Sequence, residues 1–385
     1  MKRLRVLGLV ATLMIIVASC GSTDEDETSE SEEPSDSGST GADTGDPEDS
    51  ACSDTTLTFI GLAGEEGEAE LADWREERGT LLESSWPGDW AQLISALSVG
   101  QTFDLATIPY HQAQRLIASD VLQPLDTDRL ENWDSIVPGL REHTSLRGPD
   151  GEIYGAPIAW GDAPFIYDPE RVDEPPASVL DLLKPEWKGR FVLFDTPDQP
   201  IHLLAIANGF TESPLLTPEQ LDIVTEQAGE LVANAAAFNS GYQDAADRLV
   251  AGDVDLALGG WEAMLTWAAE DGVELEFGFF DEGQGGWWDG LAIPTTADDV
   301  DCAYEYIDTI LSAEVNAELA TNLVSGAVNE GSIDLVGEVA QIYDYSVVEA
   351  PDDANFQSTT PPEDPPEGIE PYQAWIDAWA EIKAG

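Results

Sequence analysis

Strands and helices alternate along most of this chain, and the alternation limits the folds that it can adopt. Residues 56–62 (TLTFIGL) form a short apolar run rich in β-branched and aromatic side chains, which predicts a strand. Helical patterns follow at 65–78 and 90–97, and a second apolar run lies at 103–108. A strand, two helices and a strand in this order are typical of the α/β class.

The same alternation continues to the C-terminus. Further strands are predicted at 190–194, 254–258 and 291–294, and further helices at 220–232, 243–250, 300–311 and 372–383. In the last of these helices, Trp375, Ile376, Trp379 and Ile382 have the spacing of one helical face. The stretch from residue 55 onward exceeds one typical domain, and the chain's 12 Trp and 42% hydrophobic residues are ample for two cores. We therefore expect two lobes of α/β structure.

Residues 1–19 have the layout of a secretory signal peptide, with three basic residues in the first five and an apolar run at 7–17. The apolar run is shorter than the roughly 18 residues that a membrane-spanning helix needs. It leads into VASC at 17–20, which resembles a bacterial lipobox with Val17 in place of the usual Leu. The resemblance implies that Cys20 becomes the lipidated N-terminus, so we expect a lipid-anchored protein on the extracellular or periplasmic face of the cell membrane. An ordinary secretory signal with a chance cysteine is the alternative.

Residues 20–54 are expected to form an acidic, disordered tether. After Cys20 the segment consists largely of Asp, Glu, Ser, Thr and Gly and contains no aromatic residue. Such a composition buries too little apolar surface to repay the entropy of ordering. The tether would hold the folded part away from the lipid surface.

The formal net charge of −62 argues against nucleic acid and anionic lipid surfaces as partners. Loss of the basic signal peptide would make the charge more negative still. A cation is an attractive ligand for such a chain, although a salty habitat would explain most of the carboxylates equally well. A ligand needs only a few of them.

The chain contains three cysteines. If Cys20 carries lipid, Cys52 and Cys302 remain as a single possible disulfide in an oxidising compartment. Three cysteines with these assignments cannot build a metal site. We therefore expect no metal and no cofactor.

A series of short motifs runs through the folded region in a fixed order: FDL at 103–105, LQPLD at 122–126, NWD at 132–134, YGAPIAWG at 154–161, PEWKGR at 185–190, AGDV at 251–254, WWDGLAIP at 287–294 and IKAG at 382–385. No one of these motifs is decisive. In this order they resemble the spermidine/putrescine-binding group of bacterial extracellular solute-binding proteins, the solute receptors of ABC importers.

The resemblance implies a two-lobed periplasmic-binding-protein fold of type II, with two crossover strands and a ligand cleft that closes by hinge motion. By this analogy lobe one comprises residues 55–158 and 288–331, and lobe two comprises residues 159–287 and 332–385. The expected partners are a small-molecule solute and an ABC permease in the membrane. The protein is expected to be a monomer.

Three residues carry the expected ligand chemistry. Trp287 and Asp289 stand at positions that the family uses for its ligand, and Trp261 matches a second family tryptophan. A carboxylate gives charge-assisted hydrogen bonds to N–H donors, and an indole face attracts a cation and its methylene groups. Core packing is the alternative for each tryptophan. Trp288 is expected to face away from Trp287, because side chains alternate along a strand.

Tyr110 and His111 follow the predicted strand at 103–108, at the end where binding loops gather in an open α/β sheet. His111 falls where the family tends to have a ligand-facing tyrosine, although a lone histidine is as often a polar residue with structural contacts. Trp160 lies at the expected lobe crossing and is a candidate to line the cleft.

The chain departs from the polyamine pattern in several places. Residues 61–64 (GLAG) lack the aromatic group that the family places after its first strand. The family's acidic pair falls here on Thr196 and Gln199, with Asp195 and Asp198 beside them, and Ser325 replaces a family tyrosine. Gln199 and Ser325 are therefore retained as candidate ligand contacts, and a solute with one positive centre is favoured over a long polyamine.

Two further acids precede the predicted helix at 65–78. Glu65 and Glu66 could replace the lost carboxylates, but acids are also expected in the first turn of a helix because of its dipole. The second interpretation is favoured.

An enzyme is not expected. The sequence contains no G-x-S-x-G, H-E-x-x-H or Walker motif, and its three histidines lie far apart. A sugar or another polar solute is an alternative ligand for the same fold. A surface glycan hydrolase is the alternative from another class, because such an enzyme needs only two carboxylates.

Overall fold

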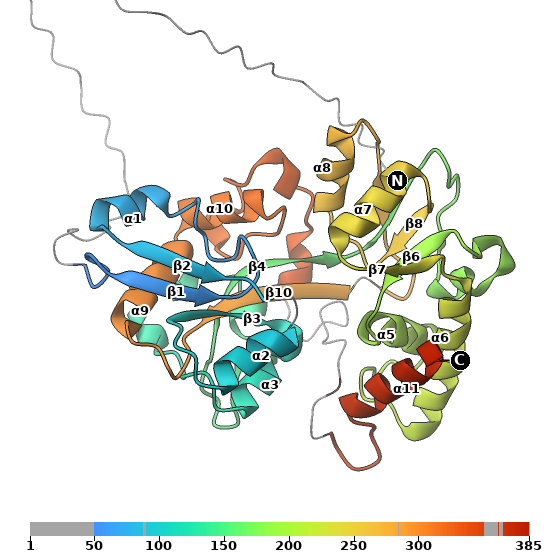
Figure 1. The fold of residues 1–385 in the computed structure, drawn as a ribbon, viewed down its shortest axis with the longest axis horizontal. Helices are drawn as coiled ribbons and strands as arrows, with labels where there is room; N and C mark the ends of the chain where they lie inside the picture. The colour runs from blue at the N-terminus through green and yellow to red at the C-terminus, as the bar shows by residue number, and fades with distance from the viewer. Residues whose placement is uncertain (1–49, 88–89, 284, 350–360, 362–364, 385) are drawn as a thin grey trace, which may run out of the picture. The chain divides into compact units, whose positions relative to one another are not determined.

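The computed structural model describes residues 50–87, 90–283, 285–349, 361 and 365–384 (Figure 1). The expected signal peptide, Cys20 and the tether up to residue 49 lie outside the described residues. None of the described helices has the length and apolar character needed to cross a membrane.

The first sheet has five strands in the order β2-β1-β3-β10-β4. They are β1 (Thr56–Ile60), β2 (Leu81–Ser85), β3 (Leu105–Pro109), β4 (Ala156–Ala163) and β10 (Gly285–Ala292). β1 is parallel to β2 and β3, so these three strands end at the same edge of the sheet. β10 is antiparallel to both β3 and β4. The carboxyl end of β3 lies beside the middle of β10, where Pro109 pairs with Asp289, and β1 lies on the other side of β3.

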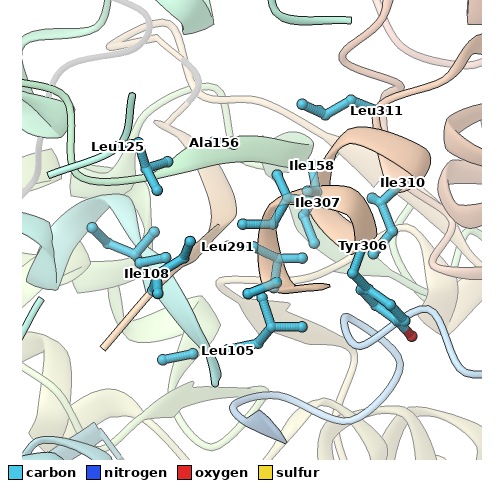
Figure 2. Close-up of a cluster of buried hydrophobic side chains, with 14 of the residues drawn as sticks. Leu105, Ile108, Leu125, Ala156, Ile158, Leu291, Tyr306, Ile307, Ile310 and Leu311 are labelled. Atoms are coloured by element: carbon cyan, nitrogen blue, oxygen red, sulfur yellow. The ribbon is translucent and has the colours of Figure 1, made fainter. Parts of the chain in front are cut away.

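Helices flank this sheet: α1 (Ala72–Arg78), α2 (Trp90–Ser98), α3 (Tyr110–Ala118), α4 (Pro138–Arg141), α9 (Val300–Ile310) and α10 (Ala313–Asn322). Figure 2 shows the core that joins sheet and helix. Leu105 and Leu291 come from the sheet, and Ile307 comes from α9. All three side chains are fully buried.

The second sheet also has five strands, in the order β7-β6-β8-β5-β9. They are β5 (Phe165–Tyr167), β6 (Phe191–Phe194), β7 (Ala237–Asn239), β8 (Leu256–Leu258) and β9 (Glu276–Gly278). β6, β7 and β8 are parallel. The sheet is accompanied by α5 (Asp198–Ala207), α6 (Pro218–Asn234), α7 (Tyr242–Ala251), α8 (Ala263–Glu270) and α11 (Tyr372–Ala384). It has cores of its own, separate from that of the first sheet.

Short 3-10 helices occupy several connections: Thr127–Arg129, Trp133–Ser135, Thr144–Leu146, Val179–Leu183, Pro185–Trp187, Glu330–Ser332, Glu338–Ala340 and Tyr345–Val348. They lie between the strands and helices of the two sheets and add no strand to either sheet.

Two long strands connect the sheets along the chain. β4 runs directly into β5 of the second sheet, and the chain returns from β9 into β10 of the first. β4 and β10 pair with each other over most of their eight residues. The predicted α/β class with two crossing strands is confirmed.

Several element boundaries differ from those predicted. The helix expected at 65–78 begins only at Ala72, because the residues before it form turns. The strands β2, β4, β5, β7 and β9 and the helices α3, α4, α5, α8 and α10 were not predicted, and β10 begins before the strand predicted at 291–294.

The C-terminal helix α11 packs on the second core through Trp375 and Trp379, which are 0% and 3% exposed. Ile382 also packs against this core. Ile376, which was predicted to share the same face, is 39% exposed. Its assignment was wrong because a residue one position after Trp375 is rotated by about 100° around the helix.

The start of the described chain is held against α9. Cys52 and Cys302 form a disulfide, with their Cα atoms 4.7 Å apart, within the range that this bond requires. The Ser50 hydroxyl donates to Glu305 at 2.7 Å. Residues 50–54, at the end of the expected tether, are thus fastened to the first core.

Candidate ligand-binding site

Two acidic side chains meet beside the carboxyl ends of β1 and β3. Asp289 lies in β10 opposite Pro109, the last residue of β3. Glu65 lies in the turn after β1. Their side chains are hydrogen-bonded to each other, and the residues are 8% and 4% exposed. The Thr107 hydroxyl donates to Glu65 Oε2 at 2.7 Å.

The hydrogen bond between these two carboxyl groups requires a proton, because two carboxylates offer only acceptors. Burial, followed by the charge of Asp289, raises the pKa of Glu65 well above its ordinary value. Burial raises the pKa of Asp289 to about 6, against a lowering by its hydrogen bond with Glu65. At neutral pH Glu65 therefore holds the proton and Asp289 carries the charge. The pair bears one negative charge in a buried place.

Gly61 allows the turn after β1 to lie directly against β3. A Cβ atom at this position would lie 1.9 Å from the Thr107 hydroxyl oxygen. That oxygen also accepts a hydrogen bond from the Leu62 amide at 3.3 Å. The absence of a side chain at Gly61 thus lets Thr107 hold both the turn and the Glu65 carboxyl group.

Trp287 stands two residues before Asp289 on the same strand and is half-buried. Its indole donates to the Asp162 carbonyl oxygen at 3.1 Å, and its ring covers Gly161, where an added Cβ would lie 2.7 Å from the ring. Trp288 is fully buried in the first core, and its ring centroid lies 5.6 Å from that of His143. This burial agrees with the expectation that Trp288 faces away from Trp287.

Trp261 follows β8 of the second sheet and is half-buried. Its indole donates to the Val324 carbonyl oxygen at 3.1 Å, and its ring meets Tyr242 edge-on with centroids 5.6 Å apart. Although Tyr242 is 39% exposed, burial and then the charge of Asp289 raise the pKa of its hydroxyl to about 12. Tyr242 therefore links Trp261 to the neighbourhood of the acidic pair.

Tyr110 and His111 begin α3 and are half-buried. Their rings lie edge-on with centroids 5.3 Å apart. Burial lowers the pKa of His111 to about 4, so its imidazole is neutral at physiological pH. Pro109, the residue before Tyr110, pairs with Asp289, so the start of α3 lies next to the acidic pair. His111 can offer a hydrogen-bond acceptor but no charge.

The structure places Trp160 in the core. It is fully buried, donates to the Ala327 carbonyl oxygen at 3.0 Å, and meets the rings of Tyr343 and Tyr345. The expectation that it lines the cleft is corrected, because this packing leaves no exposed surface on its ring.

Gln199 and Ser325 lie in different surroundings. Gln199, in α5, is half-buried, and its amide donates to the Ala163 carbonyl oxygen at 3.4 Å. Its side-chain oxygen lies against Gly259, at the end of β8. Ser325 is fully buried next to Val324, with its amide bonded to the Ala320 carbonyl oxygen at 2.8 Å.

The C-terminal helix engages the two aspartates near Thr196. Asp195 accepts from Trp379 Nε1 at 2.9 Å and from Lys383 Nζ at 2.7 Å. Asp198 accepts from the Thr196 hydroxyl at 2.9 Å and is also hydrogen-bonded to Tyr372. These carboxylates are therefore hydrogen-bonded to side chains of α11, and they do not replace the acidic pair that the sequence lacks.

Sequence reasoning missed Glu65 and Tyr242 as members of this neighbourhood. Glu65 was attributed to the first turn of a helix, whereas α1 begins seven residues later. Its position just after a predicted strand could have indicated its role. Strands that end at the same edge of a sheet bring the turns that follow them close together. Within the described ranges, no group of three or more His, Cys, Asp or Glu residues could hold a metal ion.

Known proteins share both sequence and fold with this chain. A spermidine/putrescine-binding periplasmic protein of Salmonella typhimurium is 25% identical over 222 residues, which are 57% of this chain and 62% of that protein. The match thus spans less than two thirds of that relative. The putrescine-binding periplasmic protein PotF of Escherichia coli is 25% identical over 315 residues, covering 76% of this chain and 82% of PotF.

A solved structure, the spermidine/putrescine transporter substrate-binding protein PotD of Streptococcus pneumoniae, superposes with a TM-score of 0.68 at 19% identity. The alignment covers 86% of this chain and 99% of that one. At this identity the likeness establishes the fold, the two-lobed type II architecture of periplasmic binding proteins.

The bacterial extracellular solute-binding protein family matches residues 80–343, which include β3, β10 and most of both sheets. This family is one of binding proteins, not of enzymes. The resemblance noted in the sequence is confirmed, and the chain belongs to the bacterial extracellular solute-binding protein family.

Proposed function

We propose that this protein captures a small cationic or zwitterionic solute with one positive centre and delivers it to an ABC importer. The observation that carries the proposal is the buried pair of Glu65 and Asp289, which holds one negative charge. A buried charge is strongly disfavoured without a partner. An ammonium or quaternary nitrogen of the solute would supply that partner.

The charge of the pair supports one positive centre over a long polyamine. A polyamine needs a separate anion near each ammonium group, because a buried ammonium without a partner is costly. Asp195 is bonded to Lys383 and Trp379, and Asp198 to Thr196 and Tyr372. Neither carboxylate supports a second ammonium site. The polyamine-binding relatives support a cationic solute as the broader class.

Aromatic side chains would form the walls around the positive centre. Trp287 lies on the same strand as Asp289, and Tyr242 brings Trp261 into the same neighbourhood. Indole and phenol rings attract cations by their negative faces, by about 0.5 to 2 kcal/mol depending on solvent exposure. Tyr110, His111, Gln199 and Ser325 remain candidate contacts around them.

The lipid anchor and the lobe boundaries belong to the same proposal. Cys20 would carry lipid, residues 20–49 would act as the tether, and lobe one (55–158 and 288–331) would close on lobe two (159–287 and 332–385) around the solute. The tether would let the folded part reach its permease. Cys20→Ser should abolish lipidation, and intact mass of membrane-extracted protein showing an unmodified Cys20 at the mature N-terminus would contradict the anchor.

A thermal-shift screen tests the ligand class. A soluble form that begins at Gly21 would be screened against amines, betaines, sugars and carboxylates. A ligand at 100 times its Kd should stabilise the folded protein by about 2.7 kcal/mol. We expect amines or betaines with a single positive centre to give the largest shifts, without product formation. Tight binding of a neutral sugar, or turnover of a glycan, would overturn the proposal.

A further inference from the structure

A buried glutamate lies next to the proposed aromatic wall. Glu262 directly follows Trp261 and is 2% exposed. The Tyr343 hydroxyl lies 3.1 Å from Glu262 Oε2 and 2.6 Å from the Val324 carbonyl oxygen. The Trp261 indole donates to the same carbonyl oxygen at 3.1 Å. Tyr343 and Trp261 thus share one backbone acceptor, and Glu262 contacts Tyr343.

The Tyr343 hydroxyl has one proton and two acceptors near it, the Val324 carbonyl oxygen and Glu262 Oε2. The shorter contact, to Val324, takes most of that proton. A neutral Glu262 is a weaker acceptor than a carboxylate, so it leaves the Tyr343 proton on Val324.

The surroundings of Glu262 favour this neutral form. Burial and, to a smaller extent, the charge of Asp162 raise its pKa to about 8, against a lowering by hydrogen bonds. The titratable groups that face it are Asp162 from β4, Tyr343 from the segment after 338–340, and Tyr242 from the start of α7. Tyr345 acts in turn on Tyr343. All of these groups are acids, and none brings positive charge to Glu262.

The backbone of Val324 has an unfavourable conformation, so its position depends on the hydrogen bonds that its carbonyl oxygen accepts. Val324 has a φ of +46°, a strained left-handed conformation that is rare for a β-branched residue. Such a conformation persists only where its surroundings hold it. The hydrogen bonds from Tyr343 and Trp261 are two contacts that do so.

We propose that Glu262 is a positioning residue for the ligand site, which in its protonated form holds Tyr343 and, through the Val324 carbonyl group, the indole of Trp261. The proposal rests on the proposed function only in that Trp261 is taken as a ligand wall. An ionised Glu262 is a stronger acceptor, and its charge draws the single proton of Tyr343 away from Val324. The Val324 carbonyl oxygen, which also accepts from the Trp261 indole, then loses the hydrogen bond from Tyr343, so alkaline pH changes the surroundings of this indole.

The test uses ligand-free protein labelled with ¹⁵N-tryptophan, so that each indole N–H gives its own NMR signal. Trp261→Phe identifies the signal of Trp261. In the unmodified protein we expect this signal to shift as pH rises from 6.5 to 9.5, with a midpoint near pH 8. In Glu262→Gln the signal should be constant over this range, because the amide does not ionise. A residue that only fills space would not make the Trp261 signal depend on pH in the unmodified protein and independent of pH in Glu262→Gln.

Glu276→Gln is the matched control. Glu276 also accepts from a tyrosine of the second sheet, Tyr167, at 2.6 Å, but it is exposed and bonded to neither Val324 nor Trp261. This variant should keep the alkaline shift of the Trp261 signal. Tyr343→Phe, which removes the connecting hydroxyl, should lose it.

A Trp261 signal that does not change between pH 6.5 and 9.5, or that still titrates in Glu262→Gln, would overturn this inference. Because no ligand is present, either result concerns the network alone. The proposed function fails separately, if the thermal-shift screen finds no cationic or zwitterionic solute.

Discussion

At the scale of single residues, the charge of the candidate site depends on where one proton lies. Glu65 keeps it, because burial and the neighbouring charge of Asp289 raise its pKa far above the ordinary value. Asp289 loses its own proton above about pH 6. In the proposed site, a solute cation would therefore meet one carboxylate and one neutral carboxylic acid.

This division of roles predicts that Glu65→Gln has a small effect on binding, in contrast to Asp289→Asn, which removes the charge. Glu65→Gln replaces a protonated acid by an amide that can still donate to Asp289, so affinity for the solute at pH 7 should stay within about threefold, less than the weight of one neutral hydrogen bond. Titration calorimetry of the two proteins with the solute found in the screen measures the change. A loss tenfold or greater would show that Glu65 carries the charge.

The same pair predicts an acid limb in the pH profile of binding. Cation binding needs ionised Asp289, whose pKa is about 6, so protonation competes with the solute as pH falls. Below pH 6 the affinity should fall by about tenfold per pH unit, since each unit removes that factor of the ionised form. Calorimetry between pH 4.5 and 7.5 checks this, with a neutral-pH plateau expected. Affinity that stays constant down to pH 4.5 would exclude Asp289 as the charge partner.

Some of these residues could be predicted from the sequence and others could not. Trp287 and Asp289 belong to the motif at 287–294, and Trp261 matches a second family tryptophan, so the resemblance pointed to all three residues. Glu65 and Glu262 have no such motif, and their roles depend on contacts with Asp289 and Tyr343, which lie far away in the chain. Burial and hydrogen bonding across such separations are set by tertiary packing, which a single sequence does not display.

At the scale of elements, hydrophobic periodicity located most helices but not the edges of the sheets. β2 (Leu81–Ser85) is an edge strand with no continuous apolar run, so the sequence gives little sign of it. In α11 the positions of Trp375, Trp379 and Ile382 follow the helical period and pack on the second core. The helix also holds Asp195 through Trp379 and Lys383. It therefore stabilises the second lobe at the place where the sequence lacks the family's acidic pair.

Two substitutions in α11 test that packing. Trp375→Ala removes a fully buried indole, and should lower the free energy of unfolding by about 3 to 5 kcal/mol. Ile376→Ala, at a position that is 39% exposed, should cost less than about 1.5 kcal/mol. Urea unfolding of both proteins gives the comparison. Equal losses would contradict the packing of α11 through Trp375.

At the scale of the whole molecule, two sheets with separate cores are joined by the strands β4 and β10. Length and composition predict two cores, but the crossing strands came from the resemblance to a family, because pairing between distant strands cannot be read from periodicity. Asp289 lies on one of these strands. The charge of the proposed site is thus built into the element that joins the two sheets.

The disulfide predicts a large effect on overall stability. Cys52 and Cys302 are 250 residues apart in the chain, so the bond restricts the unfolded state over a very long loop. Replacing both cysteines by serine should lower the free energy of unfolding by roughly 5 to 6 kcal/mol in the chain-entropy interpretation. Urea unfolding of the oxidised protein and the double variant measures the difference. A loss below about 1 kcal/mol would show that the loop is already restricted in the unfolded state.

The central claim is that Asp289 supplies the charge that binds a solute with one positive centre. The most direct test is titration calorimetry at pH 7 with the solute identified by the screen, comparing the unmodified protein with Asp289→Asn. The substitution keeps the size of the side chain and removes its charge. We predict a loss of about 1.5 to 3 kcal/mol in binding free energy, the range for a hydrogen bond that involves a charged group. Unchanged affinity in Asp289→Asn would contradict the account.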